Sequence, residues 1–488
     1  MIDEVVKIHD NYTFEMKVGF VGMPGKKNNQ FKVNTWFFVP GSLDINRHTY
    51  KKEHFYKDIK TNIRLITPVF SLQDIADGPD SPLVSVAKSI EKLKQQYDEK
   101  NLKELEYEFK MVNSILKSSL RNTVFAIKRI KDGASLEKAV EEYIRLVKRI
   151  TVAYRAFETE VKFVENDSKA NDFFAFGDEF MCLLIEIHSF KLLKAFARKK
   201  IDNKIALESK VSRLIKQELA YKQKRGYLSV QKDADKNNKL LILRHGILKK
   251  YIESELFLNT IKKEDGFLFR QFIYSLAAGV SMIFATIVAF SFQQEYGNFT
   301  IPFFIALVLA YMLKDRIKEL SRFYFAHKLN SRYFDLKTVL IIGKDAVGVC
   351  RESFDYIANS KVPADILKRR NRSSLLEANN NFTEEQVLLY RMQVQTNSLL
   401  INKHTAYELD GINTIIRYTI ASLTHKMDNP EVPLYFLEDE HKLTTIKGEK
   451  VYFLNMLIHM QHNDQDVISY YRLVLNRDGI KQIEKIKA

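Results

Sequence analysis

The stretch Phe272–Phe292, FIYSLAAGVSMIFATIVAFSF, contains 21 residues and no charged side chain. A short polar break, Gln293–Asn298, separates it from a second uncharged run, Phe299–Leu313, FTIPFFIALVLAYML. A helix needs about 20 apolar residues to cross the hydrocarbon core of a bilayer. The first run therefore predicts a span at 272–292. The second run, lengthened by its polar flanks and by a snorkelling Lys314, predicts a span at 297–313. We expect a two-helix transmembrane hairpin.

The whole chain of 488 residues has the composition of a folded protein, with 46% hydrophobic and 28% charged residues and few Gly and Pro. Its length allows two or three domains besides the hairpin. The two cysteines, Cys182 and Cys350, lie far apart and form no CxxC pair. This argues against a disulfide scaffold and a cysteine metal site, and for a reducing compartment. The N-terminus has no signal-peptide pattern, so we expect the internal hairpin to direct membrane insertion.

Residues 10–40 contain two runs of alternating apolar and polar side chains, which predict a β-hairpin. The inward positions are Phe14, Met16, Val18 and Phe20 in the first run and Phe31, Val33, Thr35, Phe37 and Val39 in the second. Between them, Gly22–Asn29 has turn composition, and its GMPGKK string lacks two key residues of a phosphate-binding loop. Residues 55–71 predict a third strand. We expect this β-rich segment, 1–80, to pair with the C-terminal sheet, because its own core is too small.

From Ser81–Pro82, a helix start signal, apolar residues recur at helical spacing. We expect a helical bundle over 81–266, ending in a basic juxtamembrane helix. The stretch Asp172–Lys200 is its most apolar helix, but Glu186 and His188 interrupt the apolar run. We interpret it as the central helix of the bundle, with a position along the membrane face as the alternative.

The C-terminal part, 316–488, predicts a helical extension followed by a mainly β cytosolic domain. Gly411–Met427 fits a helix slightly better than a strand. The predicted strands are 338–342, 347–356, 387–394, 434–437, 442–446, 451–460 and 469–475. The expected fold class is therefore an α+β membrane protein. Its transmembrane hairpin, 267–315, lies between a mainly helical N-terminal region that begins with a β-hairpin and a mainly β C-terminal domain.

The net charge of +16 is concentrated before the first span. Lys191–Arg270 carries 21 Lys and Arg against 9 Asp and Glu. Next to a membrane, this charge favours anionic headgroups, at roughly 1 kcal/mol per basic residue near the surface. We do not expect nucleic acid as a partner; a solvated helical face is the alternative, because acidic residues are interleaved. The basic residues expected at the membrane surface are Lys249, Lys250, Lys262, Lys263, Arg270, Lys314, Arg316, Lys318 and Arg322.

Small side chains recur every fourth residue along both apolar runs. They are Ala277, Ser281, Ala285 and Ala289 in the first run and Ala306 and Ala310 in the second. Small residues let helices approach closely in lipid, where the hydrophobic drive between helices is weak. We expect this packing face to join the two helices to each other, or to a second copy of the chain.

No pattern in the sequence predicts a catalytic residue, a cofactor or a bound metal. Glu186 and His188 are spaced Glu-x-His, so they face different sides of a helix, and neither they nor Glu179 complete a bundle metal site. His459, His462 and Asp464 lie at a strand end without a visible partner group, and a polar turn is the simpler interpretation.

The leading hypothesis is a two-pass membrane protein that holds a cytosolic interaction, scaffold or sensor module at the inner face of the cell membrane. Basic flanks place both termini in the cytoplasm. Bacterial stress and defence effectors include such layouts, which is an analogy of architecture only. The expected partners are anionic lipid and a second copy or another protein. The alternatives are an oligomeric channel or membrane-perturbing effector gated by its cytosolic domains, and an enzyme whose site is assembled from distant residues.

Overall fold

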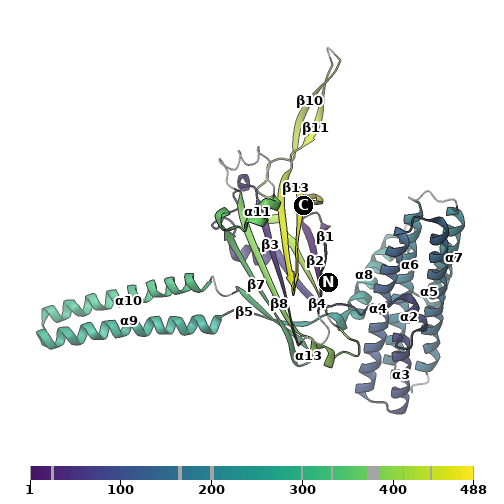
Figure 1. The fold of residues 1–488 in the computed structure, drawn as a ribbon, viewed down its shortest axis with the longest axis horizontal. Coiled ribbons are helices and arrows are strands. Elements are labelled where there is room, and N and C mark those ends of the chain that lie inside the picture. Colours follow the sequence, from purple (N-terminus) through teal and green to yellow (C-terminus); the bar gives the residue numbers. More distant parts are fainter. Residues whose placement is uncertain are drawn as a thin grey trace. The chain divides into compact units, whose positions relative to one another are not determined.

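The computed structural model describes residues 2–22, 27–162, 168–197, 203–232, 234–297, 300–330, 334–370, 385–409, 411–439 and 442–486 (Figure 1). The chain is an α+β protein that divides into two compact units. Unit 1 consists of residues 1–64, 258–406 and 410–488, and unit 2 consists of residues 65–257 and 407–409. Residues 23–26 of the GMPGKK string lie outside the described residues.

Unit 1 is built on two antiparallel sheets. The larger has eight strands in the order β14-β13-β12-β3-β8-β7-β6-β5, and the smaller has four in the order β1-β2-β9-β4. The strands are β1 (Ile2–Asp10), β2 (Thr13–Val21), β3 (Asn28–Val39), β4 (Ile59–Leu65), β5 (Asn259–Glu264), β6 (Leu336–Ile342), β7 (Asp345–Ile357), β8 (Gln386–Asn397), β9 (Gly411–Thr419), β10 (Glu431–Asp439), β11 (Lys442–Glu449), β12 (Tyr452–His462), β13 (Gln465–Asn476) and β14 (Gly479–Ile486). Strands β10 and β11 form a separate two-stranded ribbon.

Aromatic side chains fill the space between the two sheets. Phe20 of β2 stacks on Phe31 of β3 with ring centroids 4.9 Å apart. Phe37 of β3 stacks on Tyr418 of β9 at 5.4 Å. Rings of this size bury large apolar areas and add roughly 1 kcal/mol per pair beyond the area term. The alternating apolar positions noticed in the sequence therefore form the core of a two-sheet sandwich.

The predicted β-hairpin at residues 10–40 is wrong. Strand β2 pairs with β1 and β9, whereas β3 pairs with β8 and β12 in the other sheet. Each run presents a fully apolar face, and the two faces pack against each other across the core. In a hairpin within one sheet, the two faces would instead lie side by side. The helix favoured for 411–427 is also wrong in its first half, which is strand β9, paired residue by residue with β2.

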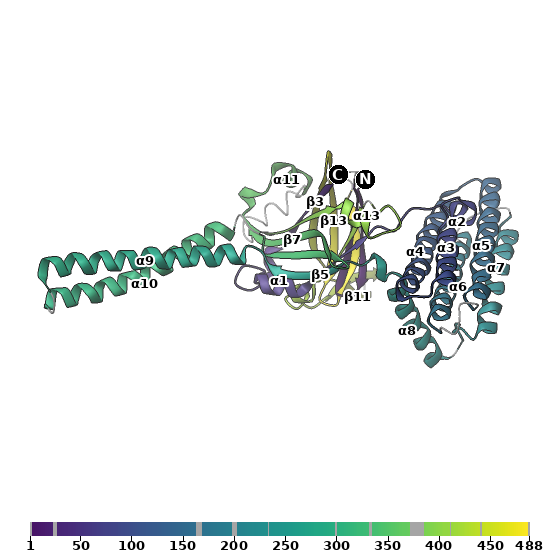
Figure 2. The same cartoon turned by 90° about the horizontal axis from the view of Figure 1, so that it is seen from below.

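Short helices complete unit 1. They are α1 (Lys52–Asp58), α11 (Ala364–Arg370), α13 (Ser398–Lys403) and α14 (Ala421–Thr424). Phe55 of α1 stacks on Phe354 of β7 at 3.9 Å. Helix α11 places Ile366 in a cluster with Trp36 and Phe38 of the larger sheet, so it covers apolar residues of that sheet (Figure 2).

Unit 2 is a helical bundle. Its helices are α2 (Leu72–Asp77), α3 (Pro82–Gln95), α4 (Glu99–Arg129), α5 (Gly133–Lys162), α6 (Ser168–Ala197), α7 (Lys204–Arg225) and α8 (Asp235–Ile252). The Ser81 hydroxyl caps α3 by accepting from the Leu83 amide, and Pro82 occupies the first turn, where its missing N–H costs nothing. Helix α6 lies in the interior, as the apolar run in its sequence predicts, because side chains on all its sides are buried.

Two long helices, α9 (Phe267–Tyr296) and α10 (Ile301–Asn330), form an antiparallel pair inserted between β5 and β6 (Figure 1). Among the described helices, α9 alone is long and apolar enough to cross a membrane. The predicted two-helix transmembrane hairpin, and with it the multi-pass topology, is therefore wrong. Only 301–313 of α10 are free of charge, and Lys314, Asp315 and Arg316 follow at once. An uncharged stretch of 13 residues gives about 20 Å of helix, short of the roughly 30 Å that a span requires.

Gly177 of α6 lies close to side chains of neighbouring helices in the bundle. A Cβ placed on Gly177 of α6 would lie 2.0 Å from the Tyr154 hydroxyl and 2.7 Å from Asn113 Nδ2, and Tyr154 is fully buried. We predict that Gly177→Ala lowers the free energy of unfolding by roughly 1–3 kcal/mol through overpacking. Chemical denaturation followed by circular dichroism measures the change.

Gly246→Ala in α8 is the matched control, because a Cβ there meets no atom within 4 Å. This substitution should leave stability unchanged or raise it by up to about 1 kcal/mol, since alanine is the better helix former. Equal stabilities of the two variants would contradict the close approach at Gly177.

Candidate membrane-binding site

Helix α9 carries an apolar surface that its own chain leaves uncovered. Of the residues in its most apolar 18-residue window, 11% are buried. The exposed side chains include Phe272, Leu276, Val280, Met282, Ile283, Ile287 and Phe290. Apolar surface in contact with water costs about 25 cal/mol per Å², and a large exposed patch of this kind marks a site for a membrane or another protein.

The small residues of the packing face lie mainly where α9 meets α10. Ala277, Ser281, Ala306 and Ala310 are all at most 6% exposed. Ala285 and Ala289 are half-buried. While α9 and α10 are packed together, the four buried side chains cannot contact a second copy of the chain. The surface that α9 offers to a partner is therefore its large apolar side chains.

Charges of α10 lie beside the middle of α9. The Arg322 guanidinium is 5.6 Å from the Tyr274 ring. In an antiparallel pair, this register places Lys314 next to Met282, well inside the uncharged stretch of α9. The Lys314 ammonium lies 4.2 Å from the Tyr311 ring on its own helix. The two helices thus share an apolar surface only along the first half of α10.

The hydroxyl groups of α9 bond to their own helix. Ser275 donates to the Gln271 carbonyl at 2.9 Å, Ser281 to the Ala278 carbonyl at 2.8 Å, and Thr286 to the Met282 carbonyl at 2.9 Å. Hydroxyls satisfied in this way add little polarity to the helix surface. The outer surface of α9 is accordingly apolar.

The predicted basic residues lie on four elements, α8, β5, α9 and α10. Lys249 and Lys250 are exposed on α8 of unit 2, whereas Lys262 and Lys263 are exposed on strand β5 of unit 1. On α10, Arg316 and Arg322 are exposed and Lys314 and Lys318 are half-buried. The side chain of Arg270 lies outside the described residues. In unit 1, Lys262 and Lys263 of β5 therefore lie at the end where the helix pair joins the sheet, whereas the basic residues of α10 extend along that helix as far as Lys314, beside the middle of α9.

The base of the helix pair is held to the sheet by Asp335. Strand β5 pairs with β6 up to Glu264 and Leu336, and the Asp265 amide then donates to the Asp335 carbonyl at 3.2 Å. The Asp335 carboxylate accepts from Lys52 Nζ at 2.8 Å, Tyr56 Oη at 2.9 Å and the Phe354 amide at 2.8 Å. Burial and the neighbouring Asp335 carboxylate raise the pKa of Tyr56 above its ordinary value, which keeps this hydroxyl a donor.

A hollow of about 720 Å³ lies at the same base. Its lining includes the aromatic residues Phe267 and Phe269, the lysines Lys263 and Lys337, and the acidic residues Glu264 and Asp265. Aromatic rings and lysines together are typical of the interfacial zone of a bilayer. The base of α9 is therefore chemically suited to the headgroup region.

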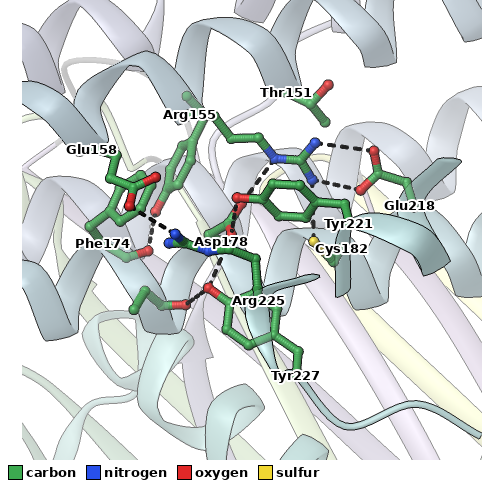
Figure 3. A network of polar contacts seen from close by, with 12 residues as sticks. Thr151, Arg155, Glu158, Phe174, Asp178, Cys182, Glu218, Tyr221, Arg225 and Tyr227 are labelled. Atoms are coloured by element: carbon green, nitrogen blue, oxygen red, sulfur yellow. Dashed lines mark hydrogen bonds and ion pairs between the residues drawn. The ribbon is translucent and has the colours of Figure 1, made fainter. Parts of the chain in front are cut away.

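Unit 2 contains a buried polar network that the sequence did not reveal (Figure 3). The Arg155 guanidinium donates to Asp178 at 3.2 Å and to Glu218 at 2.7 Å, and lies 3.5 Å from the centre of the Tyr221 ring. The hydroxyls of Tyr221 and Tyr227 donate to Asp178 at 2.9 and 3.1 Å. The network joins α5, α6 and α7, whose residues are far apart in sequence, so no local spacing could predict it.

The thiol of Cys182 lies within this network without being activated. Burial, followed by the nearby Asp178 and Glu218 carboxylates, raises its pKa well above the ordinary value of a thiol. A nucleophilic cysteine requires the opposite shift. Because the acidic groups of the network accept hydrogen bonds from Arg155 and the tyrosines, its chemistry is that of a structural clamp.

The residues considered for a metal site in the bundle do not come together, and two of them form separate ion pairs. Glu179 forms a bidentate contact with Arg244 at 2.7 and 3.1 Å, and Glu186 binds Lys222 at 2.8 Å in a buried ion pair. His188 joins neither pair in the described contacts. Among the described residues, no group of three His, Cys, Asp or Glu could hold a metal ion.

The two C-terminal histidines also serve different contacts. His459 Nε2 lies 2.5 Å from Asp466 across the β12–β13 turn. His462 packs its ring at 4.4 Å from Phe31 and contacts the Gln30 carbonyl at 3.1 Å. Both contacts stabilise the end of β12, and Asp464 is exposed in the turn.

Comparison of the chain with protein-family models, with curated proteins and with solved structures found no match.

We predict that Arg155→Met destabilises unit 2 by about 3 kcal/mol. Removing the guanidinium leaves Asp178 and Glu218 buried without a cation, and a buried charge that loses its partner costs several kcal/mol. The midpoint of urea unfolding, followed by circular dichroism, measures the change. Lys103→Met, which breaks an exposed pair with Glu99 on α4, should leave the midpoint unchanged. A midpoint of Arg155→Met equal to that control would contradict the clamp.

His188 predicts a dependence of stability on pH. Burial lowers its pKa from 6.5 to about 4, and the charges of Lys191, Lys117 and Arg121 act in the same direction. Between these two values the unfolded chain binds more protons than the folded chain. The free energy of unfolding is therefore highest above pH 6.5. It falls by on the order of 3 kcal/mol as the pH decreases from 6.5 to about 4.

His188→Leu should flatten the stability profile between pH 4 and 6.5, because the substituted chain lacks the titrating ring. Urea midpoints measured across this window test the effect, with His48→Leu at an exposed position as the control. An unchanged slope in His188→Leu would show that other groups cause the dependence.

Proposed function

We propose that the protein is anchored to a membrane by α9 and acts there as an interaction or scaffold module. The observation that carries this proposal is the uncovered apolar surface of a 30-residue helix that is long and apolar enough to cross a bilayer. In water this surface would drive aggregation, whereas in hydrocarbon it is at its free-energy minimum.

Charge supports the same assignment. Lys262 and Lys263 of β5, with Lys337 of the hollow at the base, lie where headgroups would meet a helix inserted in a bilayer. Anionic lipids attract such residues, by roughly 1 kcal/mol for each that reaches the surface.

A binding role fits the two units better than catalysis does. In unit 2, four buried acidic side chains, Asp178, Glu179, Glu186 and Glu218, are paired with cations. A fifth, Glu108, accepts a hydrogen bond from the Tyr407 hydroxyl, and burial raises its pKa. An active site commonly keeps an ionisable group with a shifted pKa in an accessible cleft. Paired groups instead give a rigid framework for a surface. We assign both units to the cytoplasmic side, because the basic residues flank the base of α9 and the two thiols are free.

Charged substitutions on the outer surface of α9 test the anchor. Ile283 and Ile287 are 61% and 60% exposed, so Ile283→Arg with Ile287→Arg should leave the α9–α10 contact intact. Each arginine in hydrocarbon costs about 2.5–3.5 kcal/mol or more. We predict that the double variant fails to float with phosphatidylcholine–phosphatidylglycerol vesicles in a density gradient, whereas the unaltered chain floats.

Leu320→Arg is the matched control, since Leu320 is 67% exposed but lies in the charged half of α10. This variant should float like the unaltered chain. If the α9 double variant also floats, the anchor does not depend on α9 and the proposal fails.

A further inference from the structure

The ribbon of β10 and β11 presents apolar side chains on both of its faces. Cross-strand partners are Leu434 with Ile446 on one face and Leu437 with Leu443 on the other. All of these are at least 50% exposed, and so are Tyr435 and Phe436. A two-stranded ribbon is marginally stable alone in water. Its exposed apolar faces are therefore typical of a surface that binds another protein surface.

The ribbon is acidic in a basic protein. Residues 431–449 contain five acidic and two basic side chains, a net charge of −3 in a chain of net charge +16. Glu438 and Asp439 lie at the described end of β10, where Glu438 also forms an exposed ion pair with Lys442. An anionic bilayer would repel this ribbon, whereas a basic protein surface would attract it.

Helix α8 provides a surface with the complementary properties. Leu240, Leu243 and Ile247 lie on one stripe of the helix and are 48%, 59% and 52% exposed. Lys236 and Lys250 fall on the same stripe by helical spacing, and both are exposed. Apolar side chains flanked by lysines match a ribbon whose apolar faces end in acidic residues.

We propose that the β10–β11 ribbon of one copy of the chain docks on helix α8 of a second copy. In a twofold dimer, each copy docks its ribbon on α8 of the other, so the contact forms twice. Two such contacts bring the buried area closer to the roughly 1,000 Å² or more that a stable interface requires. Pairing between two ribbons is disfavoured, because their charges have the same sign.

Charge exchange between the two surfaces tests the proposal. The mass of the full chain is measured by light scattering in a neutral detergent, which covers α9. We expect the mass of two copies at low salt, and a shift toward one copy at high salt. Glu438→Lys with Asp439→Lys should weaken the dimer roughly tenfold or more, and Lys236→Glu with Lys250→Glu should weaken it similarly. Combining all four substitutions should restore the dimer.

Lys100→Glu with Lys138→Glu, a matched change at exposed positions of α4 and α5, should leave the dimer unchanged. A mass of one copy for the unaltered chain, equal weakening by this control, or no recovery in the combined variant would overturn the proposal. A ribbon variant that keeps the dimer but loses binding to vesicles would assign the ribbon to the membrane instead.

Disulfide trapping gives a second readout that does not depend on charge. Cys182 and Cys350 are buried, so introduced thiols are the accessible ones. A chain carrying Phe436→Cys and a chain carrying Ile247→Cys should form a mixed disulfide when combined under mild oxidation. Linkage only within a doubly substituted chain, and none between chains, would show that the ribbon docks on its own α8 and would refute the dimer.

Discussion

The uncovered apolar surface of α9 is the constraint on which the other features of the helix pair depend. Helix α10 covers one side of α9 through the small residues Ala277, Ser281, Ala306 and Ala310, and the large side chains remain outside. Free energy is gained only when another apolar phase covers them. The arrangement at the base follows from this requirement, since Asp335 joins the pair to the sheet through Lys52, Tyr56 and the Phe354 amide.

The two units meet their packing requirements by different means. Unit 1 uses stacked rings between two sheets, such as Phe20 on Phe31. Unit 2 adds buried ion pairs to an apolar helical core, with Arg155 between Asp178 and Glu218. Such pairs contribute less to stability than apolar packing of the same volume would, but they are costly to break singly. The Arg155 pairs join residues of α5, α6 and α7.

The sequence predicted the positions of strands and helices better than it predicted which elements pair or pack with one another. Alternation at Phe14–Phe20 and Phe31–Val39 located β2 and β3, but it could not show that they lie in opposite sheets, because inward faces look the same in either arrangement. The apolar runs at 272–292 and 299–313 located α9 and the start of α10. The prediction of a second span was wrong because it added polar flanking residues to a short uncharged run. Lys314 and Arg316 end that run. The Arg155 network depends on contacts between three helices, which no local pattern contains.

Labelling with a photoreactive lipid probe that resides in the hydrocarbon core tests the central claim most directly. The full chain is reconstituted in vesicles, illuminated and digested, and the labelled peptides are identified by mass spectrometry. We expect label to concentrate on the exposed side chains of α9, such as Leu276, Ile283 and Phe290, and to be absent from the strands of unit 1 and the helices of unit 2. Label absent from α9, or spread equally over the two units, would contradict it.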